Sequence, residues 1–384
     1  MILKKRMVRL VKRVLSLINY LIPKNNTKVV FKSRPDFSGN ARALYEYINI
    51  NHKDKYKLVW ITDDSTKLPI DATVVNSGSL SALKEYVTAK YIVTTHNEMI
   101  GIKSANQSYI SLWHGMPLKK ICYLGEYDHE GMEDYSSYRI ASSELMRSII
   151  SACFREKANN VFITGQPRND YLFDLIKSNG IFESINKNKK IILYMPTFRE
   201  NQEALNYSDG KGINCDNFLR VDDFELEIIN RFLMENNAHL VIKLHPYEEK
   251  ALVNIDFGTN ITLMTTSILR KHDMDVNHLM ARANILISDY SSAYFDFMML
   301  NRPMVFLIPD VEAYSSSRGG FTLEPVSFWM PGAHVDTLHA LLDELDKLLS
   351  GNDRFEYKRK EICEIINLHK DKNNSERVFR QFFK

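Results

Sequence analysis

Short apolar runs alternate with longer segments of helical periodicity along most of the chain. In the first half, runs rich in β-branched and aromatic residues predict strands over residues 28–31, 58–62, 72–75, 91–95, 109–113, 138–141 and 161–164. In the second half, similar runs predict strands over residues 191–195, 240–244, 261–264, 285–288 and 304–308, and helical patterns such as 222–235 and 293–300 lie between them. Because strands that alternate with helices form parallel sheets, the pattern predicts an α/β protein.

A long polar segment, residues 170–190, divides this pattern into two halves. The 384 residues exceed what one ordinary core holds, so we expect two domains. The expected architecture is a pair of doubly wound Rossmann-like domains that face a cleft, over residues 24–175 and 176–384. In open α/β sheets the ligand binds beyond the carboxyl ends of the strands. The residues that follow each strand are therefore where chemistry is expected.

Residues 1–22 have the pattern of an amphipathic helix, which Pro23 ends because proline disfavours helix in the residue before it. On a helical wheel, one side carries Lys5, Arg6, Arg9, Lys12, Arg13, Ser16 and Asn19. The other side carries Leu3, Met7, Val8, Leu10, Val11, Val14, Leu15, Leu17, Ile18, Leu21 and Ile22.

Two interpretations of this helix are open. Its apolar face packs on the protein's own core, or it lies on an anionic membrane surface. A polar face that is basic and has no acidic residue is unusual for an internal helix. It suits anionic lipid, because apolar burial and electrostatic attraction add. We therefore expect segment 1–23 to be a membrane-surface helix.

Composition and charge narrow the function classes. A formal net charge of only +3 argues against a nucleic-acid-binding protein. The four cysteines have neither metal-pair nor redox-pair spacing, which is typical of a reducing compartment. No apolar run approaches the ~20 residues that span a bilayer, and no small-residue cleavage site follows the first helix. With the basic helix, these features predict a peripheral protein on the cytoplasmic face of the cell membrane.

Two histidines directly follow expected strands. His114 comes after strand 109–113 and His245 comes after strand 240–244, and a proline follows each of them closely. An imidazole can take up a proton near neutral pH, so it suits a general base. Taken alone, His114 is slightly better explained as a buried structural residue in a turn, and His245 alone is unremarkable. One in each expected domain favours a shared site, to which Lys119 adds positive charge.

Hydroxyl and cationic groups follow two further strands. Thr197 and Arg199 come after strand 191–195, and both side chains bind phosphate well, although such a segment is often only a turn. Strand 285–288 runs into Asp289, Ser291 and Ser292 and then into a helix. Either serine can cap this helix, whose N-terminus suits a pyrophosphate. Without a ligand, the same serines would be plain helix caps.

The loop after strand 304–308 contains Asp310, Glu312 and Arg318. The arginine lies among small residues, where it could approach the pyrophosphate, and the two carboxylates could accept ribose hydroxyls. An equally good interpretation is a solvated surface loop. No DxD motif or carboxylate cluster indicates a metal ion.

Together these segments resemble the CDP-glycerol glycerophosphotransferase family of teichoic-acid and capsule synthesis. The similar strings are WHGMPLKKI at 113–121, LYMPTFR at 193–199, IKLHP at 242–246, ISDYSSAYFDFMMLNRPMVFLIPDVEAY at 287–314 and RGGF at 318–321. The resemblance covers most of the chain, from residue 31 to residue 331, and the order of the strings matches as well.

The resemblance implies a glycosyltransferase-B-type fold in which the C-terminal domain holds most of the CDP. It implies transfer of glycerol phosphate from CDP-glycerol to a hydroxyl of a lipid-linked glycan or polymer, with release of CMP and with no separate cofactor. It implies that His114 and His245 are catalytic and that Ser291 and Ser292 bind phosphate. The rest of the expected substrate-binding set is Lys119, Thr197, Arg199, Asp289, Asp310, Glu312 and Arg318.

Two features depart from the family pattern and leave alternatives. The family more often has RGFY where this chain has RGGF at 318–321, so CDP-ribitol is an alternative donor. The extra N-terminal domain common in the family's polymerases is absent from the sequence, which favours a primase-like enzyme. A nucleotide-sugar glycosyltransferase of the same fold is a further alternative. A membrane-bound scaffold without activity is disfavoured, because both histidines are present.

Overall fold

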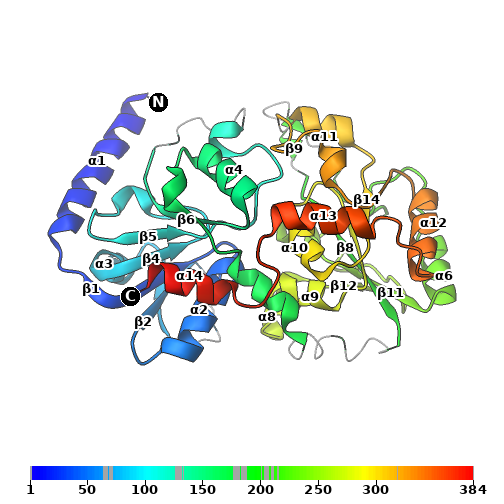
Figure 1. Cartoon of the computed structure of the whole chain (residues 1–384), viewed down its shortest axis with the longest axis horizontal. Coiled ribbons are helices and arrows are strands. Elements are labelled where there is room, and N and C mark those ends of the chain that lie inside the picture. The colour runs from blue at the N-terminus through cyan, green and yellow to red at the C-terminus, as the bar shows by residue number, and fades with distance from the viewer. Residues whose placement is uncertain are drawn as a thin grey trace. The chain divides into compact units, whose positions relative to one another are not determined.

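The computed structural model in Figure 1 describes residues 2–63, 68, 72–125, 132, 134–175, 182, 188–199, 201–202, 207–208, 212–213, 216–317 and 319–383. The chain divides into two compact units. The first unit comprises Met1–Met116, Cys122–Asp170 and Leu368–Lys384, and the second comprises Pro117–Ile121 and Tyr171–Asn367. Each unit is built on one large parallel sheet with helices between its strands, which confirms the expected α/β class.

The units differ from the expected domains in their boundaries. The division expected at residues 175 and 176 lies a few residues earlier, between 170 and 171. The C-terminal segment 368–384 belongs to the first unit, and the short segment 117–121 belongs to the second. These exchanges depend on which surface a short segment packs against, and hydrophobic periodicity does not record that.

The sheet of the first unit has seven parallel strands in the order β3-β2-β1-β4-β5-β6-β7. The strands are β1 Asn25–Lys32, β2 Lys57–Thr62, β3 Thr73–Asn76, β4 Ala89–Thr94, β5 Ser108–Ser111, β6 Tyr138–Ala141 and β7 Val161–Ile163. The helices are α1 Ile2–Leu21, α2 Gly39–His52, α3 Leu80–Thr88, α4 Glu144–Phe154 and α14 Asn374–Phe382, with short 3-10 segments η1 Ile100–Ile102, η2 Cys122–Leu124, η3 Ala158–Asn160 and η4 Pro167–Phe173. The strand order reverses where β4 pairs with β1.

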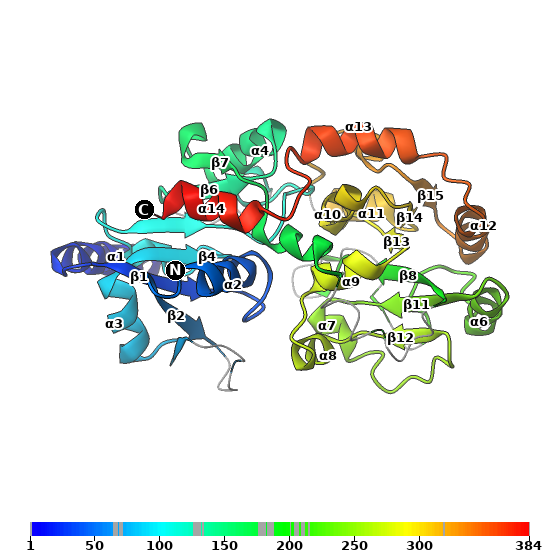
Figure 2. The same cartoon turned by 60° about the horizontal axis from the view of Figure 1, so that its bottom comes forward.

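The second sheet has the order β12-β11-β8-β13-β14-β15, which can be followed by its labels in Figure 2. Its strands are β8 Lys190–Met195, β11 Ala238–Ile242, β12 Ile261–Leu263, β13 Ile285–Ser288, β14 Met304–Leu307 and β15 Ala333–Val335. Its helices are α6 Leu226–Glu235, α7 Pro246–Glu249, α8 Thr266–Lys271, α9 Val276–Arg282, α10 Ala293–Phe297, α11 Val311–Ser317, α12 Leu338–Leu349 and α13 Glu356–Ile366, with 3-10 segments η6 Met298–Leu300 and η7 Val326–Trp329. A short hairpin pairs β9 Asn201–Gln202 with β10 Tyr207–Ser208.

Each expected strand is confirmed with shifts of at most a few residues at its ends. Central strands such as β13 and β14 are buried along their whole length, as their continuous apolar sequence predicts for strands covered on both faces. β15 was not expected, because it has only three residues and one of them is His334. Helix α6 begins four residues later than expected. Asp223, one of the residues expected to begin this helix, uses its carboxylate to accept the backbone N–H groups of Leu338 and His339 at the start of α12.

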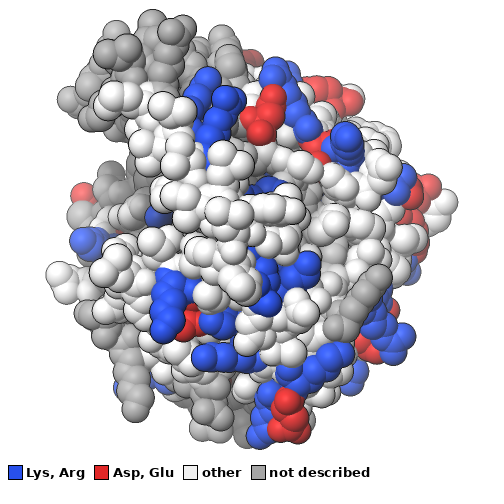
Figure 3. All heavy atoms as spheres, turned by 90° about the vertical axis from the view of Figure 1, so that its left-hand side faces the viewer, with Lys and Arg blue, Asp and Glu red and all other residues white. Residues whose placement is uncertain are grey.

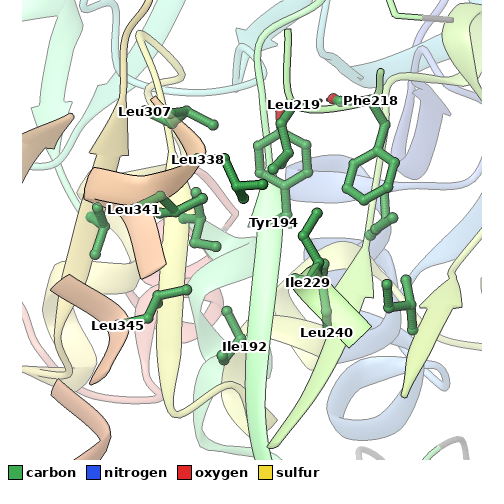
Figure 4. Packing of buried hydrophobic residues seen from close by; sticks show 14 of the residues in the cluster. Ile192, Tyr194, Phe218, Leu219, Ile229, Leu240, Leu307, Leu338, Leu341 and Leu345 are labelled. Atoms are coloured by element: carbon green, nitrogen blue, oxygen red, sulfur yellow. Dashed lines mark hydrogen bonds between the residues drawn. The ribbon is translucent and has the colours of Figure 1, made fainter. Parts of the chain in front are cut away.

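The largest core of the second unit packs its sheet against α6 and α12, as the close-up in Figure 4 shows. Leu338, Leu341 and Leu345 lie on one face of α12, because spacings of three and four residues return to the same side of a helix. They pack in one cluster with Ile229 of α6 and strand residues such as Ile192.

Helix α14 completes the core of the first unit. Val378 and Phe382 of this helix and the following Phe383 are buried in the same cluster as the residues of β1, β2 and β4. The ring of Phe383 lies 4.7 Å from that of Tyr91 and 5.7 Å from that of Tyr56, measured between centroids. The last residues of the chain are therefore part of this fold.

Helix α1 packs on the first unit through polar residues. The amide of Asn19 is buried, and its Nδ2 donates to the carbonyl of Ile102 and to Oε1 of Gln107, both at 2.8 Å. The hydroxyl of Ser16 donates to the carbonyl of Lys103. From Met7 to Leu21 the apolar residues of the helix are exposed instead, for example Leu10 at 63%, Leu17 at 70% and Leu21 at 80%.

This arrangement excludes the interpretation in which the apolar face of α1 packs on the protein's own core. Within the described part of the chain, no helix is both long enough and apolar enough to cross a membrane.

We expect Phe383→Ala to lower the free energy of unfolding of the first unit by about 3 kcal/mol, because it removes a buried ring and leaves a cavity. Urea unfolding in a Trp329→Phe background measures this, since the remaining tryptophans, Trp60 and Trp113, both lie in the first unit. The control is Tyr357→Ala, whose ring is 75% exposed on α13. If both variants lost the same free energy of unfolding, the packing of α14 in the core of the first unit would be contradicted.

Candidate active site

The turn that carries His114 is fixed by a buried amide. Asn40, near the start of α2, donates from Nδ2 to the carbonyl oxygens of Leu112 at 3.2 Å and Trp113 at 3.0 Å. Its Oδ1 accepts the backbone N–H of Arg168 at 3.1 Å. Nη1 of Arg168 in turn donates to the carbonyl of His114 at 2.7 Å. Segments that follow β1, β5 and β7 therefore meet at this turn.

His114 is exposed beyond the end of β5, after Trp113 has adopted a left-handed conformation with φ of 52°. Its Nδ1 lies 3.3 Å from the carbonyl oxygen of Thr95. A carbonyl oxygen can only accept, so this hydrogen bond requires the proton on Nδ1. Nε2 of the neutral ring then carries the lone pair, which is the form that a general base needs.

A second histidine lies flat against His114. The rings of His96 and His114 are stacked, with centroids 4.1 Å apart and planes 8° from parallel. Burial, with the nearby charge of Arg34, lowers the pKa of His96 to about 4, so this ring is neutral near pH 7. The sequence analysis missed His96, Thr95 and Asn40. The first two directly follow β4, so attention to every strand end could have found them.

In the second unit, His245 ends the segment after β11 and is the N-cap of the short helix α7. The residue is exposed, but its ring is partly desolvated and stacks on Phe198 with centroids 5.0 Å apart. This desolvation, together with Lys243 and Lys119, lowers the pKa of His245. The neutral ring is favoured, so it would stabilise a phosphate group by hydrogen bonding more than by a full positive charge.

Four of the expected substrate-binding residues form one cluster around Arg199, whose guanidinium is buried. Nη2 of Arg199 lies 2.9 Å from Oδ2 of Asp289, and its Nε lies 2.9 Å from Oδ2 of Asp310. The hydroxyl and the backbone N–H of Thr197 both donate to Oδ1 of Asp289, at 2.7 and 2.8 Å. Burial alone would lower the pKa of Arg199, but Asp289 and Asp310 raise it, so the charge persists.

The cluster ties together the segments that follow β8, β13 and β14. Two aromatic rings extend it, because Tyr290 and Tyr314 stack with centroids 4.4 Å apart and the guanidinium carbon of Arg199 lies 4.5 Å from the centroid of Tyr314. Tyr314 belongs to α11, so this helix is held against the same cluster. The contacts give Arg199 a structural role, and binding of the donor by these four residues remains a prediction.

The remaining expected residues of the second unit are less enclosed. Ser291 and Ser292 are half-buried, and the hydroxyl of Ser291 accepts the backbone N–H of Ala293 at 3.4 Å. Ser292 is the N-cap of α10 but makes no side-chain cap. Glu312 is exposed on α11, and Arg318 lies outside the described residues. Among the residues that the structure describes, no group of three His, Cys, Asp or Glu side chains could hold a metal ion.

Lys119 lies in the short segment 117–121, which belongs to the second unit. It forms an antiparallel bridge with Phe321, and the backbone N–H of Thr322 donates to the carbonyl of Leu118 at 2.8 Å. Nζ of Lys119 lies 5.5 Å from the ring centroid of Tyr314. The segment after His114 and the segment after Arg318, which are far apart in the sequence, are therefore neighbours.

The family model described as CDP-Glycerol:Poly(glycerophosphate) glycerophosphotransferase matches residues 14–384. The chain belongs to this family. The match covers both units and confirms the resemblance that the strand-end strings indicated, including the class of enzyme.

Curated relatives of this glycerophosphotransferase make teichoic acids. A teichoic acid poly(glycerol phosphate) polymerase of Bacillus spizizenii is 31% identical over 85% of this chain and 85% of the relative. The protein of the same name from Bacillus subtilis is 28% identical over 90% of this chain, which spans about half, 49%, of that relative. The ribitol-phosphate polymerase TarL of Staphylococcus aureus is 28% identical over 94% of this chain and 63% of the relative.

Among solved structures, the wall teichoic acid polymerase TagF matches 99% of this chain and 96% of its own, with a TM-score of 0.76 and 21% identity. This likeness confirms the glycosyltransferase-B-type fold expected for the glycerophosphotransferase.

We expect Arg199→Lys to lower the free energy of unfolding of the second unit by about 2–4 kcal/mol, because an ammonium group lacks the planar fork of donors with which Arg199 reaches Asp289 and Asp310. Hydrogen exchange should become faster in α11, which Tyr314 holds to the cluster. The control is Arg354→Lys, which keeps the positive charge of an exposed arginine beside Glu344 and should cost less than about 0.5 kcal/mol. Unchanged exchange in α11 would show that the cluster does not hold this helix.

Proposed function

We propose that this enzyme transfers glycerol phosphate from CDP-glycerol to a hydroxyl of a lipid-linked glycan or polymer, releasing CMP, in teichoic-acid or capsule synthesis. The observation that carries the proposal is the orientation of His114. In a chain of the glycerophosphotransferase family, its Nδ1 lies 3.3 Å from the carbonyl oxygen of Thr95, an orientation in which Nε2 of the neutral ring would take up a proton. A solved TagF variant that was soaked with CDPG has the same fold as this chain, with a TM-score of 0.77.

The reaction is a displacement at phosphorus. The acceptor oxygen forms a bond to the β-phosphorus of the donor, and the bond from this phosphorus to the bridging oxygen of CMP breaks. Nε2 of His114 takes the proton of the acceptor hydroxyl, and CMP leaves with the bonding electron pair. The ring N–H of His245 and the hydroxyls of Ser291 and Ser292 stabilise charge on the pyrophosphate, with Arg318 as a further cation.

A ribitol donor is the second candidate, and specific relatives favour it. Besides TarL, the ribitol-phosphate polymerase TarK of Staphylococcus aureus is 26% identical over 98% of this chain. Glycerol and ribitol phosphate differ in the length of the polyol, so the reaction at phosphorus is the same for both. A nucleotide-sugar glycosyltransferase would instead form its bond at a sugar carbon and release a nucleoside diphosphate.

The exposed apolar side of α1 supports peripheral attachment to an anionic membrane, and we propose the cytoplasmic face of the cell membrane. Figure 3 shows the face of the first unit that carries α1, where patches of Lys and Arg border a broad uncharged area. Arg9 and Arg13 of α1 are both exposed beside the apolar residues of the helix. Each basic residue near such a surface contributes on the order of 1 kcal/mol, and apolar burial adds to it.

We expect the purified enzyme to release CMP from CDP-glycerol when a lipid-linked acceptor is present, and His114→Ala to lower kcat by about 10²–10⁴-fold. The assay compares CDP-glycerol, CDP-ribitol and a UDP-sugar and identifies both the released nucleotide and the extended acceptor. His339→Ala, an exposed histidine of α12, is the control. Sugar transfer with release of UDP would contradict polyol-phosphate transfer, and normal turnover by His114→Ala would exclude this residue as the base.

We expect the triple variant Leu10→Gln, Leu17→Gln, Leu21→Gln to lose at least about tenfold in affinity for vesicles that contain phosphatidylserine, because it removes apolar area that the lipid would bury. Its thermal stability should stay unchanged, since these side chains face solvent. The control is Ile50→Gln, which changes an apolar residue that is 76% exposed on α2. Sedimentation with vesicles measures binding, and unaltered sedimentation of the triple variant would contradict attachment through α1.

A further inference from the structure

Thr95, which directly follows β4, contacts both stacked histidines. Its backbone carbonyl lies 3.3 Å from Nδ1 of His114, and its hydroxyl oxygen lies 3.0 Å from Nδ1 of His96. The residue is buried, so each of these polar atoms needs a partner inside the protein. Thr95 therefore holds both the expected base, His114, and the ring that stacks on it, His96.

The hydroxyl of Thr95 also favours one tautomer of His96. This hydroxyl accepts the backbone N–H of Arg34 at 3.1 Å. Its single hydrogen remains to be donated, and within the described residues Nδ1 of His96 is the acceptor at hydrogen-bond distance. With a pKa lowered to about 4, His96 is neutral near pH 7, so its own proton is on Nε2. These contacts favour opposite tautomers for the two histidines.

Burial is the main reason that the ring of His96 is uncharged. Arg34, which follows β1, disfavours a second positive charge. A carboxylate oxygen of Glu98 accepts the backbone N–H of His96 at 2.8 Å, so it binds the main chain of this residue. His114 faces the ring directly. A neutral ring in this place does not oppose the positive charge that His114 gains when it takes up a proton, whereas an imidazolium would.

We infer that His96 is a positioning residue for His114: its flat neutral ring holds the imidazole of His114 in the orientation in which Nδ1 donates to Thr95 and Nε2 faces the acceptor hydroxyl. The ring of Trp113 also contacts this imidazole, with centroids 4.2 Å apart, but its plane is tilted by 34°, so His96 is the ring that lies parallel to His114. Loss of His96 removes this parallel face and allows the imidazole to turn about its Cβ–Cγ bond, which breaks the hydrogen bond to the carbonyl. This inference rests on the proposed function, because it gives His114 the role of base.

The test compares His96→Ala, which removes the ring, with His96→Phe, which keeps a flat neutral ring. We expect His96→Ala to lower kcat by about 10–100-fold while KM for CDP-glycerol changes less than about twofold. His96→Phe should retain kcat to within about threefold of the unaltered enzyme. Equal activity of His96→Ala and the unaltered enzyme would overturn the inference, as would a loss in His96→Phe as large as that in His96→Ala.

A spectroscopic measurement tests the positioning without turnover. Long-range ¹H–¹⁵N spectra of histidine-labelled protein report the tautomer of each ring, and the signals of His114 are assigned by their absence in His114→Ala. We expect the Nδ1–H form in the unaltered protein and in His96→Phe, and a mixture of forms in His96→Ala. A pure Nδ1–H form in His96→Ala would overturn the inference even if the protein folds normally. If His114→Ala keeps full turnover, the proposed base is wrong, while the spectra still decide whether His96 positions this ring.

Discussion

The parallel pairing of strands that are not consecutive in the chain, β1 with β4 and β8 with β13, is the constraint on which the rest of this structure depends. At these two places the strand order reverses, so the segments that leave neighbouring strands diverge and leave space beyond the sheet edge. The polar residues of both units gather there. In the first unit they follow β1, β4 and β5, and in the second they follow β8, β13 and β14.

The two units fill this space with different kinds of polar group. The first uses the amide of Asn40, the carbonyl of Thr95 and two stacked imidazoles, and Arg168 donates to the carbonyl of His114. The second uses buried charges, with Arg199 held between Asp289 and Asp310. The charges of this cluster must be paired, because an unpaired buried charge would strongly destabilise the folded protein.

In most amphipathic helices the apolar side faces the protein, whereas in helix α1 the polar side faces the protein and the apolar side faces outward. The amide of Asn19 and the hydroxyl of Ser16 hydrogen-bond to the segment that contains η1, and this polar contact fixes which side of the helix faces outward. A contiguous exposed apolar surface is unfavourable in water unless another apolar phase covers it. The orientation of the helix is thus set by a few hydrogen bonds, and its apolar side is what the proposed membrane contact uses.

The sequence by itself determined the α/β class, the position of each central strand, the amphipathic character of α1 and the family, because hydrophobic periodicity and the strand-end strings are local properties. It also placed His114 and His245 at strand ends. Only the tertiary structure decided that Asn40, Thr95 and His96 surround His114, that Arg199 pairs with two carboxylates, and that α14 completes the first core. These contacts join residues tens to hundreds of positions apart, and their geometry depends on strand order, which no local pattern encodes.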